Sequence, residues 1–197
     1  MRVISGEAKA RRLYSVRGDG TRPITDRVKT SLFNILAPRV QDARFLDLFA
    51  GTGGVGIEAL SRGAREAVFV EWGERAVVTI RRNLTVTSFT DCAQVVRKDV
   101  FKFIAAHQGP PFDIIYVAPP QYQGLWSRTL LALDTSALLT PGGLAVAQIH
   151  PKEYKPLVLD RLVLSDQRKY GSTLLCFYAA PHPPIAESPS SSDSPGE

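Results

Sequence analysis

Three glycines near residue 50 have the spacing of a loop that binds a cofactor. Gly51, Gly53 and Gly56 follow the apolar run Arg44–Phe49, and a helical pattern begins at Val55. Glycines at this spacing between a strand and a helix let the backbone turn tightly and approach a ligand, and the helix N-terminus favours negative charge. The pattern predicts a nucleotide-type cofactor site, but the glycines alone do not choose between cofactors.

Three acidic residues are placed to contact such a cofactor. Glu71 ends the next predicted strand, where an acid accepts hydrogen bonds from ribose hydroxyls, although it also fits a strand-end carboxylate that faces water. Asp47 lies inside the first strand, outside the dinucleotide fingerprint, and suits a cofactor with a cationic amino group and a sulfonium centre. Asp99 is placed to meet the exocyclic amine of an adenine, or simply to cap the helix beginning near Val100.

A second candidate site follows the fourth predicted strand, residues 113–117. It reads Ala118-Pro119-Pro120-Gln121-Tyr122. The segment leaves the carboxyl end of its strand, which is where open α/β sheets bind ligands. The prolines also fit a simpler role as a rigid exit from the strand. We expect this segment to line a substrate pocket.

These residues need a scaffold, and short apolar runs alternate with helical stretches along the middle of the chain. This succession predicts βαβ units, and therefore an α/β, Rossmann-like sheet that is mostly parallel, with helices on both faces. The last two of seven strands have a short connection and are expected to pair antiparallel at one edge. The predicted strands are residues 44–49, 67–71, 93–98, 113–117, 144–148, 162–165 and 173–178, and the predicted helices are residues 55–61, 74–86, 100–106 and 125–133.

The two ends of the chain differ from this middle part. Residues 3–5 and 13–16 are predicted to form a small hairpin, and a helix is expected from Thr25 to about Leu36, before Pro38. Residues 181–197 are rich in Pro and Ser and are expected to be a disordered tail. We therefore divide the chain into an N-terminal extension (residues 1–40), an α/β domain (residues 41–180) and this tail.

Positive charge is concentrated in the N-terminal part. Residues 1–44 contain ten Lys and Arg against four Asp and Glu, whereas residues 45–197 contain fourteen against fifteen. Attraction to phosphates is long-ranged and independent of sequence, so a basic segment on a neutral body indicates an appendage that binds a polyanion. The alternative is a solvated surface that happens to be basic.

Other classes of protein fit the sequence poorly. No apolar run approaches the roughly 20 residues of a membrane helix, and the N-terminus lacks the pattern of a signal peptide. Cys92 and Cys176 lie far apart and match no metal spacing, which favours two thiols in a reducing compartment. We expect a cytoplasmic protein with no membrane segment and no metal site.

Longer stretches around these residues resemble a known family. Residues 47–53, which include Phe49, and residues 56–64 resemble motif I of class I methyltransferases. Across residues 2–178 the chain resembles the RsmD-like family, which methylates a guanine N2 of bacterial small-subunit ribosomal RNA. The likeness is carried by Gly6, Lys9, Arg11 and Arg12, the run Arg22-Pro23-Ile24-Thr25-Asp26-Arg27-Val28-Lys29, the triplet Leu32-Phe33-Asn34, and Arg168-Lys169-Tyr170-Gly171-Ser172-Thr173.

The resemblance implies a cofactor, partners and a set of site residues. The cofactor is S-adenosyl-L-methionine, residues 41–180 are the methyltransferase domain, and the partner is ribosomal RNA or the assembling small ribosomal subunit. We expect the protein to be a monomer. The expected cofactor-binding residues are Asp47, Phe49, Gly51, Gly53, Glu71 and Asp99. The expected target pocket is Ala118, Pro119, Pro120 and Tyr122, and the expected RNA-binding residues are Lys9, Arg11, Arg12, Arg22 and Arg27.

The sequence departs from the family in this pocket. The family carries Asp-Pro-Pro followed by Tyr or Phe, whereas this chain has Ala118 in place of the acid and Gln121 in place of the aromatic residue. The exocyclic amine of guanine is a poor nucleophile, and acceptors on its N–H bonds orient it and stabilise developing positive charge. Loss of one such preorganised partner lowers rates by roughly 100-fold to 1,000-fold. Tyr122, one position later, is left to stack on the base.

The sequence therefore leaves two alternatives to an RNA guanine-N2 methyltransferase. The first is a catalytically impaired homologue that binds cofactor and RNA, because of Ala118 and Gln121. The second is an NAD-dependent oxidoreductase, which depends on the glycine spacing alone and is disfavoured by Asp47 and by the two prolines.

Overall fold

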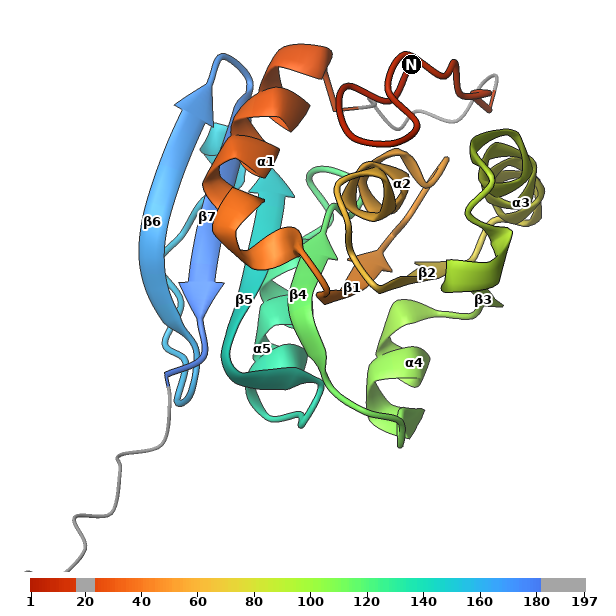
Figure 1. The fold of residues 1–197 in the computed structure, drawn as a ribbon. Helices are drawn as coiled ribbons and strands as arrows, with labels where there is room; N and C mark the ends of the chain where they lie inside the picture. Colours follow the sequence, from red (N-terminus) through yellow and green to blue (C-terminus); the bar gives the residue numbers. More distant parts are fainter. Residues whose placement is uncertain (17–23, 182–197) are drawn as a thin grey trace, which may run out of the picture.

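The structure is a computed structural model that describes residues 1–16 and 24–181. Within them the chain forms a seven-stranded sheet in the order β3-β2-β1-β4-β5-β7-β6 (Figure 1). The strands are β1 (Arg44–Leu48), β2 (Glu66–Glu71), β3 (Ala93–Arg97), β4 (Phe112–Val117), β5 (Leu139–Ile149), β6 (Val163–Tyr170) and β7 (Thr173–Ala179). The helices are α1 (Asp26–Val40), α2 (Gly54–Ser61), α3 (Glu74–Thr87), α4 (Val100–Ala106) and α5 (Leu125–Asp134), with short 3-10 helices η1 (Thr90–Cys92) and η2 (Pro151–Glu153).

The order of the strands confirms the predicted Rossmann-like fold. Strands β1 to β5 pair in parallel, and β7 is antiparallel to both β5 and β6, as expected for the last two strands. The chain order reverses between β1 and β4, which are neighbours in the sheet. The loops that leave the carboxyl ends of these two strands therefore lie side by side, at the place where open α/β sheets bind ligands.

Two apolar clusters, one on each face, hold the helices against the sheet. Successive residues of a strand point to opposite faces, so Phe45 packs in the cluster with α1, α2 and α3, while Leu46 packs in the cluster with α4 and α5. Figure 1 shows the two helical layers on either side of the sheet. By the same alternation Asp47 shares a face with Phe45, beneath α2.

The N-terminal segment, residues 1–16, forms a shorter and less regular hairpin than predicted. Residues 3–5 and 13–16 form no strands, and a single antiparallel bridge joins Arg2 to Arg12. Gly6 has a φ of 82°, and a side chain there would place its Cβ 1.6 Å from the carbonyl oxygen of Ser61. The segment therefore turns on itself against α2 (Figure 1), and its Val3, Ala8 and Leu13 are buried in the cluster of α1 and α2.

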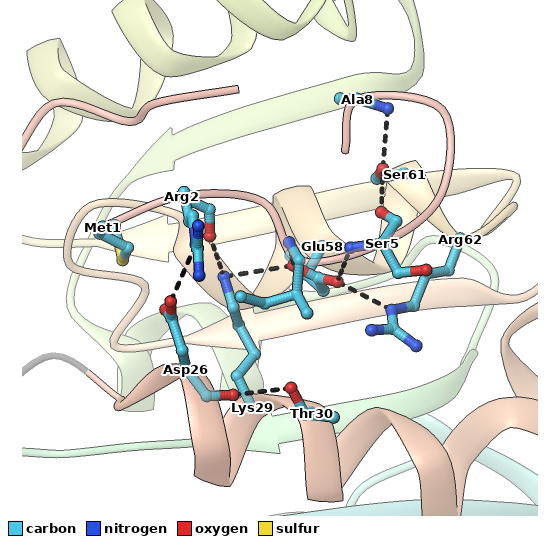
Figure 2. Close-up of polar contacts among 12 residues, drawn as sticks. Met1, Arg2, Ser5, Ala8, Asp26, Lys29, Thr30, Glu58, Ser61 and Arg62 are labelled. Atoms are coloured by element: carbon cyan, nitrogen blue, oxygen red, sulfur yellow. Dashed lines mark hydrogen bonds and ion pairs between the residues drawn. The ribbon is translucent and has the colours of Figure 1, made fainter. Parts of the chain in front are cut away.

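A buried carboxylate of α2 holds the N-terminal segment in place. Glu58 of α2 accepts hydrogen bonds from the backbone N–H groups of Ile4 and Ser5, at 2.8 and 3.0 Å. Its carboxylate also lies 3.2 Å from the Nζ atom of Lys29 of α1, and both side chains are fully buried (Figure 2). Lys29 Nζ donates in turn to the carbonyl oxygen of Arg2 at 2.7 Å. We call these contacts the Glu58 network.

Two positive charges, those of Lys29 and Arg62, lie next to the buried carboxylate of Glu58. Burial lowers the pKa of Lys29, and the neighbouring Glu58 carboxylate opposes that shift. Arg62 Nε donates to Glu58 at 2.8 Å, one helical turn later. The hydroxyl of Ser61 accepts from Ala8 N–H at 3.0 Å and donates to the Ser5 carbonyl at 2.6 Å. Figure 2 shows how these side chains converge on the N-terminal segment from two helices.

The boundaries of several elements differ from those predicted. Helix α1 begins as expected, with Thr25 Oγ1 accepting from Val28 N–H, but it continues through Pro38 to Val40. A proline this near the end removes only one backbone hydrogen bond, and the burial of Val40 holds the last turn. Strand β1 ends before Phe49 because that residue has a φ of 60°. Strands β5 and β6 are longer than predicted.

Candidate active site

The glycine loop, residues 49–53, connects β1 to α2 in a left-handed backbone conformation. The φ angles are 60° at Phe49, 56° at Gly51 and 76° at Gly53, which precedes the first residue of α2. Glycine adopts such angles without strain. Open space lies beside Gly51, where no atom comes within 4 Å of the position that a Cβ would take. The loop can therefore present its backbone to a ligand at the N-terminus of α2.

Glu71 holds this loop from the neighbouring strand. Its Oε2 atom accepts from Gly51 N–H at 2.8 Å, and its Oε1 atom accepts from Gly73 N–H at 2.8 Å. The side chain is half-buried at the carboxyl end of β2. A carboxylate fixed in this way has a defined direction, and its remaining lone pairs are available to a ligand.

Asp47 lies beneath the glycine loop and contacts α2. Its carboxylate is 2% exposed and accepts from Gly56 N–H at 2.9 Å, which ties β1 to the first turn of α2. Burial raises the pKa of Asp47 to about 8; the Gly56 hydrogen bond opposes this shift, and the charge of Glu71 adds to it. The structure thus assigns Asp47 a contact that sequence reasoning did not foresee, and contact with a cofactor amino group stays a prediction.

Two further polar residues lie beside Asp47 on the same face. Tyr116 of β4 is the register partner of Asp47 and donates its hydroxyl hydrogen to Gln148 Oε1 of β5 at 2.5 Å. Burial raises the pKa of Tyr116 well above its usual value, and the Asp47 charge acts in the same direction. A row of polar side chains therefore runs across β1, β4 and β5, directly below the two loops.

Asp99 has the structural role that the sequence left open. It is the N-cap of α4, and its Oδ1 atom accepts from Lys102 N–H at 3.0 Å. The residue follows β3, so it also lies at the carboxyl edge of the sheet. Contact between Asp99 and an adenine stays a prediction.

The proline loop, residues 118–122, adjoins the glycine loop. Ala118 N–H donates to the carbonyl oxygen of Leu48 at 3.4 Å, immediately before Phe49. The side chain of Tyr122 is exposed, and its φ is 60°. The two loops therefore begin side by side at the carboxyl ends of β1 and β4.

His150 and Glu153 support Tyr122, and sequence reasoning missed both. Glu153 of η2 accepts from Tyr122 N–H at 2.7 Å through Oε2 and from His150 N–H at 3.3 Å through Oε1. The His150 ring lies 5.5 Å from the Tyr122 ring, centroid to centroid. The signal available in the sequence was position: His150-Pro151-Lys152-Glu153 follows the fifth strand, at the same edge as the other candidates.

The predicted RNA-binding residues that the structure describes lie on the N-terminal segment and on α1. Lys9, Arg11 and Arg12 are exposed on the N-terminal segment, and Arg27 is exposed on the first turn of α1. Arg22 lies outside the described residues. These exposed basic residues lie on elements that pack against α2, and their contact with RNA stays a prediction.

No group of three or more His, Cys, Asp or Glu in residues 1–16 and 24–181 could hold a metal ion. In the same residues no helix has the length and apolar character needed to cross a bilayer.

The fold and the two adjoining loops define a class I methyltransferase. A sequence profile of the family described as "Conserved hypothetical protein 95" matches residues 1–179. The chain therefore belongs to this family, the RsmD-like family whose motifs it carries. Membership of a methyltransferase family also removes the basis of the oxidoreductase alternative.

Individual relatives cover almost all of the chain. A Bacillus subtilis (strain 168) protein named "Putative rRNA methyltransferase YlbH" is 40% identical over 90% of this chain and 98% of its own length. Ribosomal RNA small subunit methyltransferase D of Escherichia coli (strain K12) is 35% identical over 90% of this chain and 89% of its own. The solved structure of "Putative methyltransferase yhhF" from Escherichia coli has a TM-score of 0.82 at 33% identity, over 93% of this chain and 99% of that one.

A more distant structure shares the fold alone. An RNA methyltransferase from Salinibacter ruber, solved in complex with S-adenosyl-L-homocysteine, is 15% identical, with a TM-score of 0.64 over 85% of this chain and 98% of that one.

Proposed function

We propose that the protein transfers a methyl group from S-adenosyl-L-methionine to the exocyclic N2 amine of a guanine in small-subunit (16S) ribosomal RNA. One observation carries the proposal: the glycine loop and the proline loop leave the carboxyl ends of the adjacent parallel strands β1 and β4, whose pairing continues to the hydrogen bond between Ala118 N–H and Leu48 of β1. They do so in a chain related to ribosomal RNA small subunit methyltransferase D.

The residues present fit this cofactor. Glu71 offers a fixed, half-buried carboxylate to ribose hydroxyls, and the open side of Gly51 leaves room for the methionine moiety beside backbone N–H groups. Asp47 lies below, where its carboxylate can balance a positively charged amino group. We assign Phe49 and Asp99 to the same cofactor. When bound, S-adenosyl-L-methionine supplies an electrophilic methyl group on a positively charged sulfur.

The proline loop orients the target base. Tyr122, exposed and held by Glu153, stacks on the guanine, which must leave its helix or come from a loop. The carbonyl oxygens of Ala118 and Pro119 accept from the N2 amine, since Ala118 has no acceptor in its side chain. Pro120 keeps the loop rigid. Positioning provides most of the rate acceleration, because no residue of the pocket is a strong base.

The basic residues hold the RNA. Lys9, Arg11, Arg12 and Arg27 are exposed, and we add Arg22 by its place in the family motif. Contacts from such side chains to phosphates fix the position of a nucleic acid without reading its sequence. We place the protein in the cytoplasm, with ribosomal RNA or the assembling small subunit as its partner.

A catalytically impaired homologue is the second candidate, and Ala118 is the observation that favours it. Transfer of tritium from labelled S-adenosyl-L-methionine to unmethylated small ribosomal subunits separates the two. Transfer above background that falls in Pro119→Ala supports the enzyme. Binding of cofactor and RNA without transfer, restored by Ala118→Asp, supports the impaired homologue and contradicts the proposal.

A further inference from the structure

Asn83 of α3 is a buried amide that contacts both the glycine loop and the N-terminal segment. Its Nδ2 atom donates to the carbonyl oxygen of Thr52 in the glycine loop at 2.9 Å. The same nitrogen donates to the carbonyl oxygen of Tyr14 at 3.1 Å, and Asn83 Oδ1 accepts from Tyr14 N–H at 2.7 Å. The side chain is fully buried. Segments 31 and 69 residues away from Asn83 in the chain thus meet at one amide.

The geometry of an amide makes this contact specific. A primary amide has two N–H donors, and here one goes to each of the two segments while the oxygen is occupied by Tyr14. A shift of Tyr14 would therefore leave buried polar groups without partners unless Asn83 moved as well, which would in turn release Thr52. Glu71 holds Gly51 from the other side of the loop. Asn83 and Glu71 together fix the two residues at the centre of the glycine loop.

The part of the N-terminal segment between its anchors carries the basic residues. The Glu58 network fixes residues 4–8, and Asn83 fixes Tyr14. Lys9, Arg11 and Arg12 are exposed between these anchors and form no ion pair with another described residue. The guanidinium of Arg82, next to Asn83 on α3, lies over the Tyr14 ring at 3.5 Å from its centroid. Lys9, Arg11 and Arg12 thus lie within five residues of Tyr14, whose backbone contacts Asn83.

We propose that Asn83 is a positioning residue that couples RNA on the N-terminal segment to S-adenosyl-L-methionine on the glycine loop. RNA that holds the segment in place keeps Asn83 on Thr52, and thereby favours the loop conformation that binds the cofactor. Coupling of this kind is reciprocal, so cofactor strengthens RNA binding by the same factor. The inference rests on the proposed function and adds a link between its two ligands.

The test measures affinity for S-adenosyl-L-homocysteine by calorimetry, with and without a saturating transcript of small-subunit ribosomal RNA. In the unaltered protein we expect RNA to tighten binding at least about 5-fold. In Asn83→Ala the ratio of the two dissociation constants is expected to fall to about one. Thr87→Val is the matched control, because it deletes another buried polar group of α3 whose hydrogen bonds go only to α3 carbonyls. We expect Thr87→Val to be less stable than the unaltered protein but to keep its ratio of the two dissociation constants.

A second pair of variants probes the same contact from the surface. Tyr14→Pro removes the N–H that donates to Asn83, while Tyr14→Ala removes the exposed ring and keeps that N–H. Both substitutions leave Asn83 and the other buried residues of α3 unchanged. If Asn83→Ala does not fold, this pair of variants still tests whether the Tyr14–Asn83 contact couples the two ligands. In the proline variant we expect the ratio of the two dissociation constants to fall to about one, and in the alanine variant we expect it to stay close to that of the unaltered protein.

The outcomes separate this inference from the proposed function. Binding of both ligands by the unaltered protein with a ratio of one overturns the coupling and leaves the methyltransferase proposal intact. A ratio that survives in Asn83→Ala and in Tyr14→Pro, or that Thr87→Val abolishes equally, also overturns it. Failure to bind either ligand contradicts the proposed function itself.

Discussion

Glu71 holds the glycine loop and Asp47 holds the first turn of α2, but the two carboxyl groups differ in their access to solvent. Glu71 is half-buried at the edge of the sheet, whereas Asp47 is enclosed beneath the loop, and burial raises its pKa to about 8. A carboxyl group in such a place favours its neutral form. Asp47 therefore lowers the stability of the ligand-free protein at neutral pH, which is consistent with a residue that serves a ligand.

This view of Asp47 gives a prediction about pH. The native state keeps Asp47 protonated up to about pH 8, while the unfolded chain ionises near pH 3.9. The contribution of Asp47 to stability is thus fully present below about pH 4 and is lost as the pH rises toward 8. Asn does not titrate and can still accept from Gly56, so we expect Asp47→Asn to raise the melting temperature of the ligand-free protein more at pH 8 than at pH 5.

Thermal unfolding at the two pH values, together with S-adenosyl-L-homocysteine binding, checks this. Binding is expected to weaken in Asp47→Asn, because Asn cannot ionise when the cationic cofactor binds above it. An equal change in melting temperature at both pH values would show that Asp47 is ionised in the native state, contrary to our interpretation.

Tyr122 gives a second prediction at this scale. Stacking of a base on an aromatic side chain contributes about 1–3 kcal/mol. Replacing Tyr122 by Ala should therefore weaken RNA binding by roughly 5-fold to 150-fold and lower methyl transfer. Tyr122→Phe keeps the ring and should stay close to the unaltered protein in filter binding. Equal losses in both variants would assign the effect to the hydroxyl and contradict a stacking role.

At the scale of elements, the Glu58 network joins α1, α2 and the N-terminal segment. We expect Glu58→Gln to lower the free energy of unfolding by about 3–5 kcal/mol, because it leaves Lys29 as a buried charge without its partner. Arg2→Ala is the control: its pair with Asp26 is exposed, at 62% and 46%, and such pairs contribute up to about 1 kcal/mol. Urea unfolding measures both, and similar losses in the two variants would contradict the role given to Glu58.

The same elements show what a sequence can predict. The central strands could be predicted because buried residues such as Phe45, Leu46 and Val68 form continuous apolar runs, and the parallel pairing of the first five strands follows from alternating strands and helices. The shape of residues 1–16 could not be predicted in this way. It depends on Glu58, which lies 54 residues from Ile4 in the chain and does not stand out as a partner.

In the candidate site, too, some features could be predicted from the sequence and others could not. Glycine spacing, the strand-end acid Glu71 and the two prolines are local patterns, and the structure brings them to one edge of the sheet. The support from Asn83, His150 and Glu153 was missed. Asn83 and Glu153 contact backbone groups of a distant loop, His150 contacts the ring of Tyr122, and no sequence motif marks such contacts.

At the scale of the whole molecule, positive charge lies in residues 1–44, while the rest of the chain is close to neutral. If Lys9, Arg11 and Arg12 contact phosphates, the triple alanine variant should reduce the slope of log affinity against log salt concentration by about 2–3. Arg65→Ala is the control, since Arg65 is exposed at the opposite edge of the sheet, just before β2. A slope unchanged in the triple variant would assign RNA binding to another surface.

The most direct test of the account is the methylation state of small-subunit ribosomal RNA in cells that lack this protein. Mass spectrometry of the RNA, digested to nucleosides and to oligonucleotides, would locate the change. We predict the loss of one N2-methylguanosine, restored by the unaltered gene and not by a Glu71→Ala variant that cannot hold the glycine loop. Small-subunit RNA with all its N2-methylguanosines intact in such cells would contradict the proposed function.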